Sequence, residues 1–142
     1  MTLSRILIAL HGYMGVLCAV ALLHPAILMR RGQALSRGAR WSIALTTLST
    51  IAAFGLGIFM YEDYRNQVKR DLFRISSQTG LLFETKEHLA FYALVLAWTG
   101  CALVFAAPED DARRLARLAF GASAALVLAV GAMGSIVASV PL

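Results

Sequence analysis

Apolar residues form four long blocks along the chain, and most charged residues lie between these blocks. The blocks predict membrane spans over residues 3–29, 41–61, 84–107 and 113–140. A helix needs about 20 consecutive apolar residues to cross the hydrocarbon core of a bilayer. The blocks reach that length without the strict apolar–polar alternation of half-buried strands. The pattern therefore predicts an all-α integral membrane protein whose four transmembrane helices form an up-down bundle.

The links between the blocks are short, with one exception. The first link is "RRGQALSRGAR", and the last link is "PEDDARRLAR". Neither segment is long enough to form a separate soluble domain with its own core. We therefore expect residues 1–142 to fold as a single four-helix transmembrane domain.

The second link, residues 62–87, is the longest and carries an amphipathic pattern. Its apolar residues recur at helical spacing, at Val68, Leu72 and Ile75. Its basic residues fill the other face, among them Arg65, Lys69 and Arg70. This spacing predicts a short amphipathic helix on the membrane surface between the second and third spans, or a continuation of the second span. The sequence "SSQTG" predicts a turn after it that ends at Gly80.

The composition supports a membrane location and bears on orientation. Hydrophobic residues make up 59% of the chain and charged residues 15%, whereas soluble domains carry about 25% charged residues. The net charge of +5 does not point to nucleic acid, because most of the 13 Lys and Arg residues flank the apolar blocks and can contact lipid headgroups. The acid-free first link favours a cytoplasmic location for that side. Both termini would then face the periplasm of a bacterial inner membrane.

Two histidines in the first span cannot share one site. His11 and His24 lie 13 residues apart, which corresponds to about 19.5 Å along a helix and about 140° around it. His24 precedes Pro25, which removes a helical hydrogen bond and bends the chain. We interpret His24 as a structural residue that reaches the interface or bonds a carbonyl freed by the bend.

His11 and His88 are the candidate ligands. Intramembrane ionisable residues usually face the interior of a bundle and mark a functional site. The first and third spans run in the same direction, so His11 and His88 are expected near the same surface at similar depth. Two imidazoles facing each other across a bundle can ligate a haem iron from both sides. We therefore predict haem b between these helices, with Tyr61 against the ring and the propionates near Arg65, Lys69 and Arg70.

This combination of features suggests an electron carrier. The architecture, together with His11 and His88, is broadly similar to that of small four-helix membrane cytochromes. That resemblance implies a b-type cytochrome that exchanges electrons with quinone or with a partner complex. The chain would then act as a carrier or an accessory subunit rather than as a stand-alone enzyme.

Two alternatives remain open. Small residues at intervals of four, such as Gly131, Ser135 and Ser139, favour close helix–helix contact. They suit a non-catalytic subunit that packs against other membrane chains or a second copy of itself. Glu84 lies four residues before His88, and with His11 these groups suggest a non-haem metal site or a proton relay. Acidic residues near the start of a helix are also favoured by the helix dipole alone.

Overall fold

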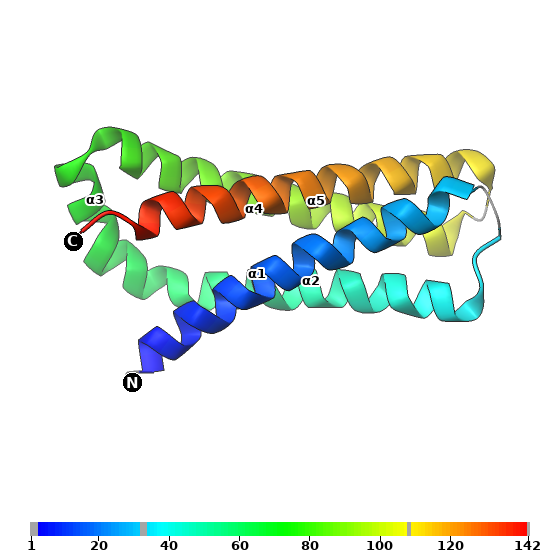
Figure 1. Cartoon of the computed structure of the whole chain (residues 1–142), viewed down its shortest axis with the longest axis horizontal. Helices are drawn as coiled ribbons and strands as arrows, with labels where there is room; N and C mark the ends of the chain where they lie inside the picture. Colours follow the sequence, from blue (N-terminus) through cyan, green and yellow to red (C-terminus); the bar gives the residue numbers. More distant parts are fainter. Residues whose placement is uncertain (1–2, 32–33, 108, 142) are drawn as a thin grey trace.

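The computed structural model describes residues 3–31, 34–107 and 109–141. Its elements are α1 (Leu3–Leu28), the 3₁₀-helix η1 (Met29–Arg31), α2 (Arg37–Tyr64), the π-helix η2 (Arg65–Lys69), α3 (Arg70–Ile75), α4 (Ser77–Ala106) and α5 (Asp110–Ala138). Within these described ranges, four helical segments are long and apolar enough to cross a membrane. They pack as an elongated all-α bundle with both termini at one end (Figure 1). The predicted four-helix bundle is confirmed, and its candidate transmembrane helices indicate an integral membrane protein.

Serine side chains define where two of these helices begin. The backbone N–H of Ala39 donates to Ser36 Oγ at 3.2 Å at the start of α2. The backbone N–H of Thr79 donates to Ser76 Oγ at 3.3 Å at the start of α4. Each hydroxyl thus satisfies an N–H that has no carbonyl partner within its helix. As a result α4 begins at Ser77, well before the apolar segment expected to span the membrane.

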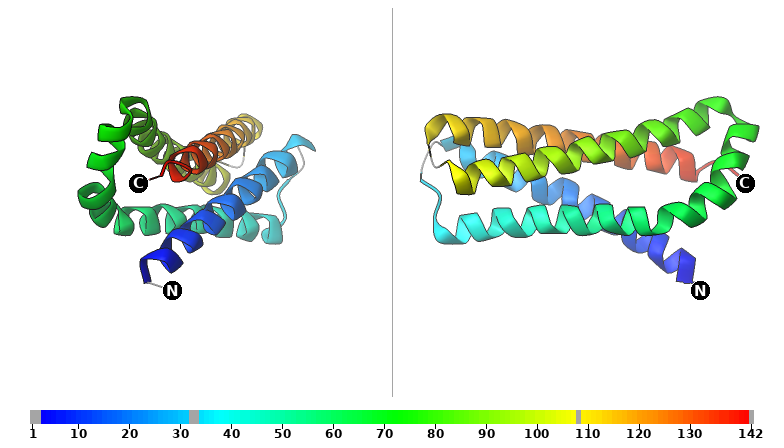
Figure 2. Two further views of the ribbon diagram at one scale, coloured as in Figure 1. Left: turned by 60° about the vertical axis from the view of Figure 1, so that its left-hand side comes forward. Right: turned by 180° about the vertical axis from the view of Figure 1, so that it is seen from behind.

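The prediction of a separate surface helix after the second span is wrong, and its alternative, a continuation of the second span, is confirmed. The helical run that begins at Arg37 continues to Ile75 over 39 residues. No glycine or proline interrupts it between Tyr61 and Ile75, and the π-helix η2 carries α2 into α3 without a break. The helical path ends at Ser76, whose backbone is extended with φ −156° and ψ 115°. Figure 2 shows this run curving over the end of the bundle from α2 toward α4.

The amphipathic pattern is explained by packing within the bundle. Leu72 is fully buried, and it forms a cluster with Phe83 of α4 and Val137 of α5. The curved helix therefore places Leu72 against the bundle, while Ile75 at its end stays exposed. Gly80 also has a different role from the predicted turn, because it lies inside α4. A Cβ added there would come within 2.6 Å of the Phe73 ring, so glycine lets α3 and α4 approach closely.

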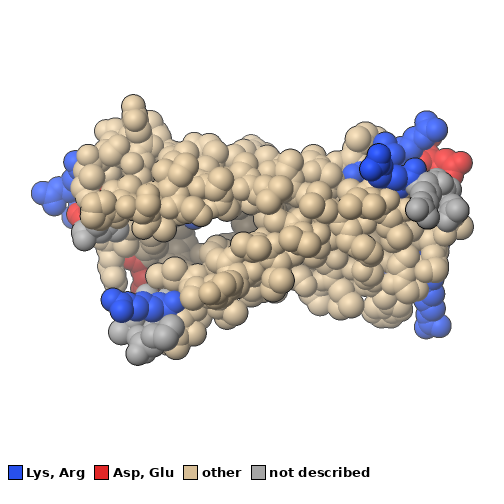
Figure 3. Space-filling view, viewed as in Figure 1, with Lys and Arg blue, Asp and Glu red and all other residues tan. Residues whose placement is uncertain are grey.

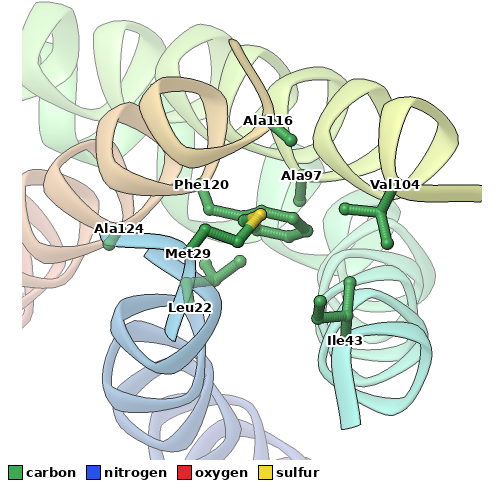
Figure 4. Packing of buried hydrophobic residues seen from close by; sticks show 8 residues of the cluster. All are labelled: Leu22, Met29, Ile43, Ala97, Val104, Ala116, Phe120 and Ala124. Carbon is green, nitrogen blue, oxygen red and sulfur yellow. The ribbon is translucent and has the colours of Figure 1, made fainter. Parts of the chain in front are cut away.

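The main core lies at the end of the bundle opposite the termini. It is built from eight buried side chains: Leu22, Met29, Ile43, Ala97, Val104, Ala116, Phe120 and Ala124 (Figure 4). The Phe120 ring lies among side chains from all four long segments and is fully buried. We call this end the packed half.

Small residues allow α4 and α5 to approach closely in the packed half. A Cβ added at Gly100 would come within 2.8 Å of the Phe120 ring. The Ser123 hydroxyl is buried and donates to the backbone carbonyl oxygen of Ala93 at 2.7 Å. In lipid, helices associate through such close contacts and through hydrogen bonds between them, because lipid tails solvate apolar side chains well.

The end that carries the termini is more open. Figure 3 shows an opening in the surface between the N-terminal half of α1 and the pair α4 and α5. The first residue of α1 to be buried is Cys18, among the residues whose side chains are described. The small residues Gly131 and Ser135 of α5 and Ser139 just after it are exposed, so this stripe does not form a contact within the described bundle. We call this end the open half.

Candidate functional site

A layer of polar side chains crosses the open half. It lies near the level at which α2 and α4 change from uncharged to charged sequence. No charged residue occurs from 41 to 61 in α2 or from 89 to 106 in α4. The uncharged part of α4 is about 27 Å long at 1.5 Å per residue, close to the hydrocarbon thickness of a bilayer. The polar layer comprises His11, Tyr61, Tyr64, Lys69, Glu84, Lys86, Glu87 and His88. Its place at this boundary makes it the candidate functional site.

His11 is held between α1 and α2. Its Nδ1 lies 3.1 Å from the backbone carbonyl oxygen of Ala53. A Cβ added at Gly57 would come within 2.9 Å of its Cε1, so the ring packs directly on the α2 backbone. A ring nitrogen that faces a carbonyl has to carry the proton, which leaves the lone pair of a neutral imidazole on Nε2.

His88 occupies a different environment on the outer side of α4. Its Nδ1 lies 2.7 Å from the carbonyl oxygen of Glu84, one turn earlier in the same helix. The same reasoning places the lone pair of its neutral ring on Nε2. The ring lines a hollow of about 320 Å³ together with Tyr61, Glu87, Phe91 and Tyr92. His88, Phe91 and Tyr92 are exposed, so this hollow opens on the outer surface of the bundle.

The structure does not bring His11 and His88 into one cavity. His11 is not among the residues that line the hollow around His88. Ala93 and Ala97 mark the inward face of α4, because both are buried. Lys86 lies seven residues before Ala93 and shares that face, whereas His88 is rotated by about 200° from Lys86. The inward position that sequence reasoning gave to His88 is therefore occupied by Lys86.

Lys86 is the functional candidate that the sequence reasoning missed. Its Nζ lies 4.5 Å from the centroid of the Phe83 ring. Its Cδ would lie 3.8 Å from a Cβ added at Gly134 of α5. It is also close enough to His11 for an electrostatic interaction. Within the described residues it forms no ion pair. The spacing of seven puts Lys86 on the same helix face as Ala93, but only the burial of Ala93 in the structure shows that this face points inward.

The other predicted site residues divide between the hollow and the surface. Tyr61 lines the hollow with His88. Lys69 pairs with Glu84 through an Nζ–Oε1 distance of 2.7 Å, so η2 is tied to α4. Arg65 and Arg70 are exposed. Over the described ranges, no group of three His, Cys, Asp or Glu side chains is placed to hold a metal ion.

Electrostatic contacts link the members of the polar layer. Glu87 interacts with Lys86, Lys69, Glu84 and His88. Tyr64 stacks on Phe83 with ring centroids 4.3 Å apart, and its buried hydroxyl has no hydrogen-bond partner among the described residues. The layer therefore combines two imidazoles, two carboxylates, two ammonium groups and two phenols.

His24 lies outside this layer, as the sequence predicts. Its Nδ1 lies 3.4 Å from the hydroxyl oxygen of Ser42 in α2, within the packed half. Pro25 beside it is buried. His24 thus links α1 to α2 and provides a matched control for experiments on the other two histidines.

The hollow is the part of the layer best suited to a ligand. The lone pair on His88 Nε2 and the carboxylate of Glu87 are hydrogen-bond acceptors, and the Tyr61 hydroxyl can donate or accept. Phe91 and Tyr92 supply apolar ring surface beside these groups. Such a site can hold a flat aromatic head that carries hydroxyl groups.

Comparison with known proteins finds no family, no curated protein and no solved structure that matches this chain.

Proposed function

We propose that this chain binds the head of a quinol in the hollow between α2 and α4 and so takes part in quinone-dependent electron transport. The single observation that carries the proposal is the presence of His88 and Glu87 in one hollow with Tyr61, Phe91 and Tyr92. A quinol carries two hydroxyl donors on an aromatic ring, and this lining offers acceptors for those donors beside aromatic surface.

The position of the hollow favours a ligand that arrives from the bilayer. Tyr61 and His88 stand at the boundary between the charged and the uncharged segments of their helices. A quinol has the same division, with a polar ring attached to an apolar tail. The ring would lie at this boundary while the tail follows the exposed apolar surface of α4, where Val95 and Trp98 lie.

The hydrogen-bonding pattern favours the reduced over the oxidised form of the ligand. His88 Nδ1 donates to Glu84, so a neutral ring offers only an acceptor to the hollow. A quinone presents only acceptors, so only the tyrosine hydroxyls of this lining could donate to it. The two hydroxyls of a quinol, by contrast, find two acceptors in this lining, His88 Nε2 and the Glu87 carboxylate.

Binding to the purified protein in quinone-free lipid nanodiscs tests the proposal. A short-tailed ubiquinol kept under a reducing atmosphere is titrated, and quenching of aromatic fluorescence is followed. We expect the quinol to bind about tenfold more tightly than the matching quinone, because about 1–2 kcal/mol depends on the hydroxyl donors. His88→Ala and Glu87→Gln should each weaken quinol binding by about fivefold or more.

His24→Ala is the matched control, since it removes an imidazole from the other end of the same bundle. It should leave the affinity for quinol unchanged. Equal affinities in His88→Ala, His24→Ala and the unaltered protein would overturn the proposal, as would tighter binding of the quinone than of the quinol.

Haem remains a second candidate because His11 and His88 each keep an Nε2 lone pair while Nδ1 donates to a backbone carbonyl. Histidines that ligate metals commonly have this arrangement. A haem held by both rings stays a prediction, with His11 lying against α2 and His88 exposed on α4. Absorbance spectra of the oxidised and reduced protein test it. A Soret band lost in His11→Ala but kept in His24→Ala would support haem, and a colourless folded protein would exclude it.

A further inference from the structure

A second hollow lies in the packed half, at the opposite end from the polar layer. It has a volume of about 230 Å³ and is lined by Arg37, Arg40, Trp41, Ala44 and Phe105. The first four residues belong to the beginning of α2, and Phe105 lies at the end of α4. We propose that this hollow binds the headgroup of an anionic phospholipid, independently of the quinol site.

Charge is the first argument for an anionic ligand. Arg37 and Arg40 are exposed, and neither forms an ion pair within the described residues. The whole segment from residue 30 to residue 40 contains no acidic residue. Guanidinium groups bind phosphate oxygens through two parallel hydrogen bonds, so two arginines on one hollow form a phosphate-binding surface.

Position and shape are the second argument, and they point to a lipid. Trp41 begins the uncharged segment of α2, and Phe105 stands near the end of that of α4. Tryptophan at such a boundary is typical of the membrane–water interface. The volume of about 230 Å³ exceeds that of one water, about 30 Å³ in the liquid, but it is far too small for a whole lipid. In the proposed arrangement the phosphoglycerol head lies in this hollow while the acyl chains run along the exposed Trp41 and Phe105 into the bilayer.

The same charges select among headgroups. A zwitterionic phosphatidylcholine would bring a cationic choline group close to Arg37 and Arg40. Phosphatidylglycerol brings the phosphate without that cation. Basic pockets at the ends of membrane helices recognise anionic lipids in this way, so phosphatidylglycerol is the occupant to which we commit.

The fluorescence of Trp41 reports directly on the hollow. Trp98 is the other tryptophan of the chain, and Trp98→Phe leaves Trp41 as the single reporter. This variant is placed in phosphatidylcholine nanodiscs that contain a small fraction of brominated phosphatidylglycerol or of brominated phosphatidylcholine. We expect phosphatidylglycerol to be favoured by about fivefold for each arginine that it contacts.

Two double variants distinguish a site from a diffuse charge effect. Arg37→Gln with Arg40→Gln removes the two cations of the hollow and should reduce the preference to about one. Arg114→Gln with Arg117→Gln removes the same charge from the same end but not from the hollow, and it should leave the preference intact. Arg37→Lys with Arg40→Lys should keep part of the preference, because charge is retained without the forked geometry.

Three outcomes would overturn the proposal. Equal quenching by the two brominated lipids would show that no headgroup is selected. Equal losses in the two glutamine double variants would show attraction to the basic end as a whole. Displacement of brominated lipid by soluble glycerol phosphate at the affinity of the lipid itself would show that the hollow binds free phosphate esters rather than a membrane lipid.

Discussion

The packed half and the open half are built from the same four long segments, yet they differ in what fills the space between the helices. In the packed half the Phe120 ring is fully buried among aliphatic and small side chains. In the open half the corresponding space receives His11 and Lys86, and the surface is open between α1 and the pair α4 and α5 (Figure 3). Close packing between the helices at one end therefore holds them in place, while polar side chains enter the space between the helices at the other.

The comparison also shows that glycine has two uses in this bundle. Because Gly100 has no side chain, the apolar Phe120 ring can pack against its backbone. The His11 imidazole packs against Gly57 in the same way. The first contact fills the gap between α4 and α5 with the Phe120 ring and leaves no room there for a ligand. The second contact positions an ionisable group while the neighbouring space stays open.

Removing the Phe120 ring tests how far the bundle depends on the packed half. Phe120→Ala should lower the free energy of unfolding by about 3 kcal/mol, near the lower end of the range for buried aromatic residues. The value lies at that end because lipid tails also solvate the exposed ring after unfolding. Denaturation in mixed micelles of a mild detergent and dodecyl sulfate measures it. Leu118→Ala, at a lipid-facing position of the same helix, should change stability by less than about 0.5 kcal/mol.

Substitution of Lys86 tests the open half, and here the expected change is a gain rather than a loss of stability. Lys86→Met keeps most of the side-chain volume and removes a cation that has no ion-pair partner among the described residues. We expect the variant to be more stable by about 1–2 kcal/mol, since a poorly paired charge inside a membrane bundle is costly. The same denaturation measures this change, with Arg74→Met on the exposed surface of α3 as control. A large loss of stability in Lys86→Met would show that the ammonium supports the fold.

The division between the halves explains which features the sequence could predict. Four apolar blocks and their order specify four spans, because length and hydropathy alone decide whether a helix can cross a bilayer. The separation of His24 from His11 followed from helix geometry, and the structure places their hydrogen bonds on different parts of α2. These properties depend only on a helix and its own sequence.

The remaining features depend on how the helices are rotated and where they bend. His88 was expected to face inward, but the buried residues Ala93 and Ala97 set the rotation of α4 and turn Lys86 inward instead. The surface helix was expected from its apolar spacing, but that spacing equally fits burial of Leu72 against Phe83 and Val137. An apolar stripe predicts that a face will be covered, without indicating whether lipid or protein covers it. The contact of His11 with Gly57 could not be predicted for the same reason, because the sequence does not show which face of α2 lies next to α1.

One substitution made in both halves compares them most directly. Gly100→Ala and Gly57→Ala each place a methyl group within about 3 Å of a ring, at 2.8 Å from Phe120 and 2.9 Å from His11. Alanine favours a helix over glycine by about 0.5–1 kcal/mol, while overpacking costs about 1–3 kcal/mol where neighbours cannot move. Phe120 is fully buried, so Gly100→Ala should lose about 1 kcal/mol overall. His11 is only partly buried and can shift by giving up its bond to Ala53, so Gly57→Ala should be nearly neutral. Denaturation of the two variants side by side measures the difference, and equal losses would mean that the open half is as rigid as the packed half.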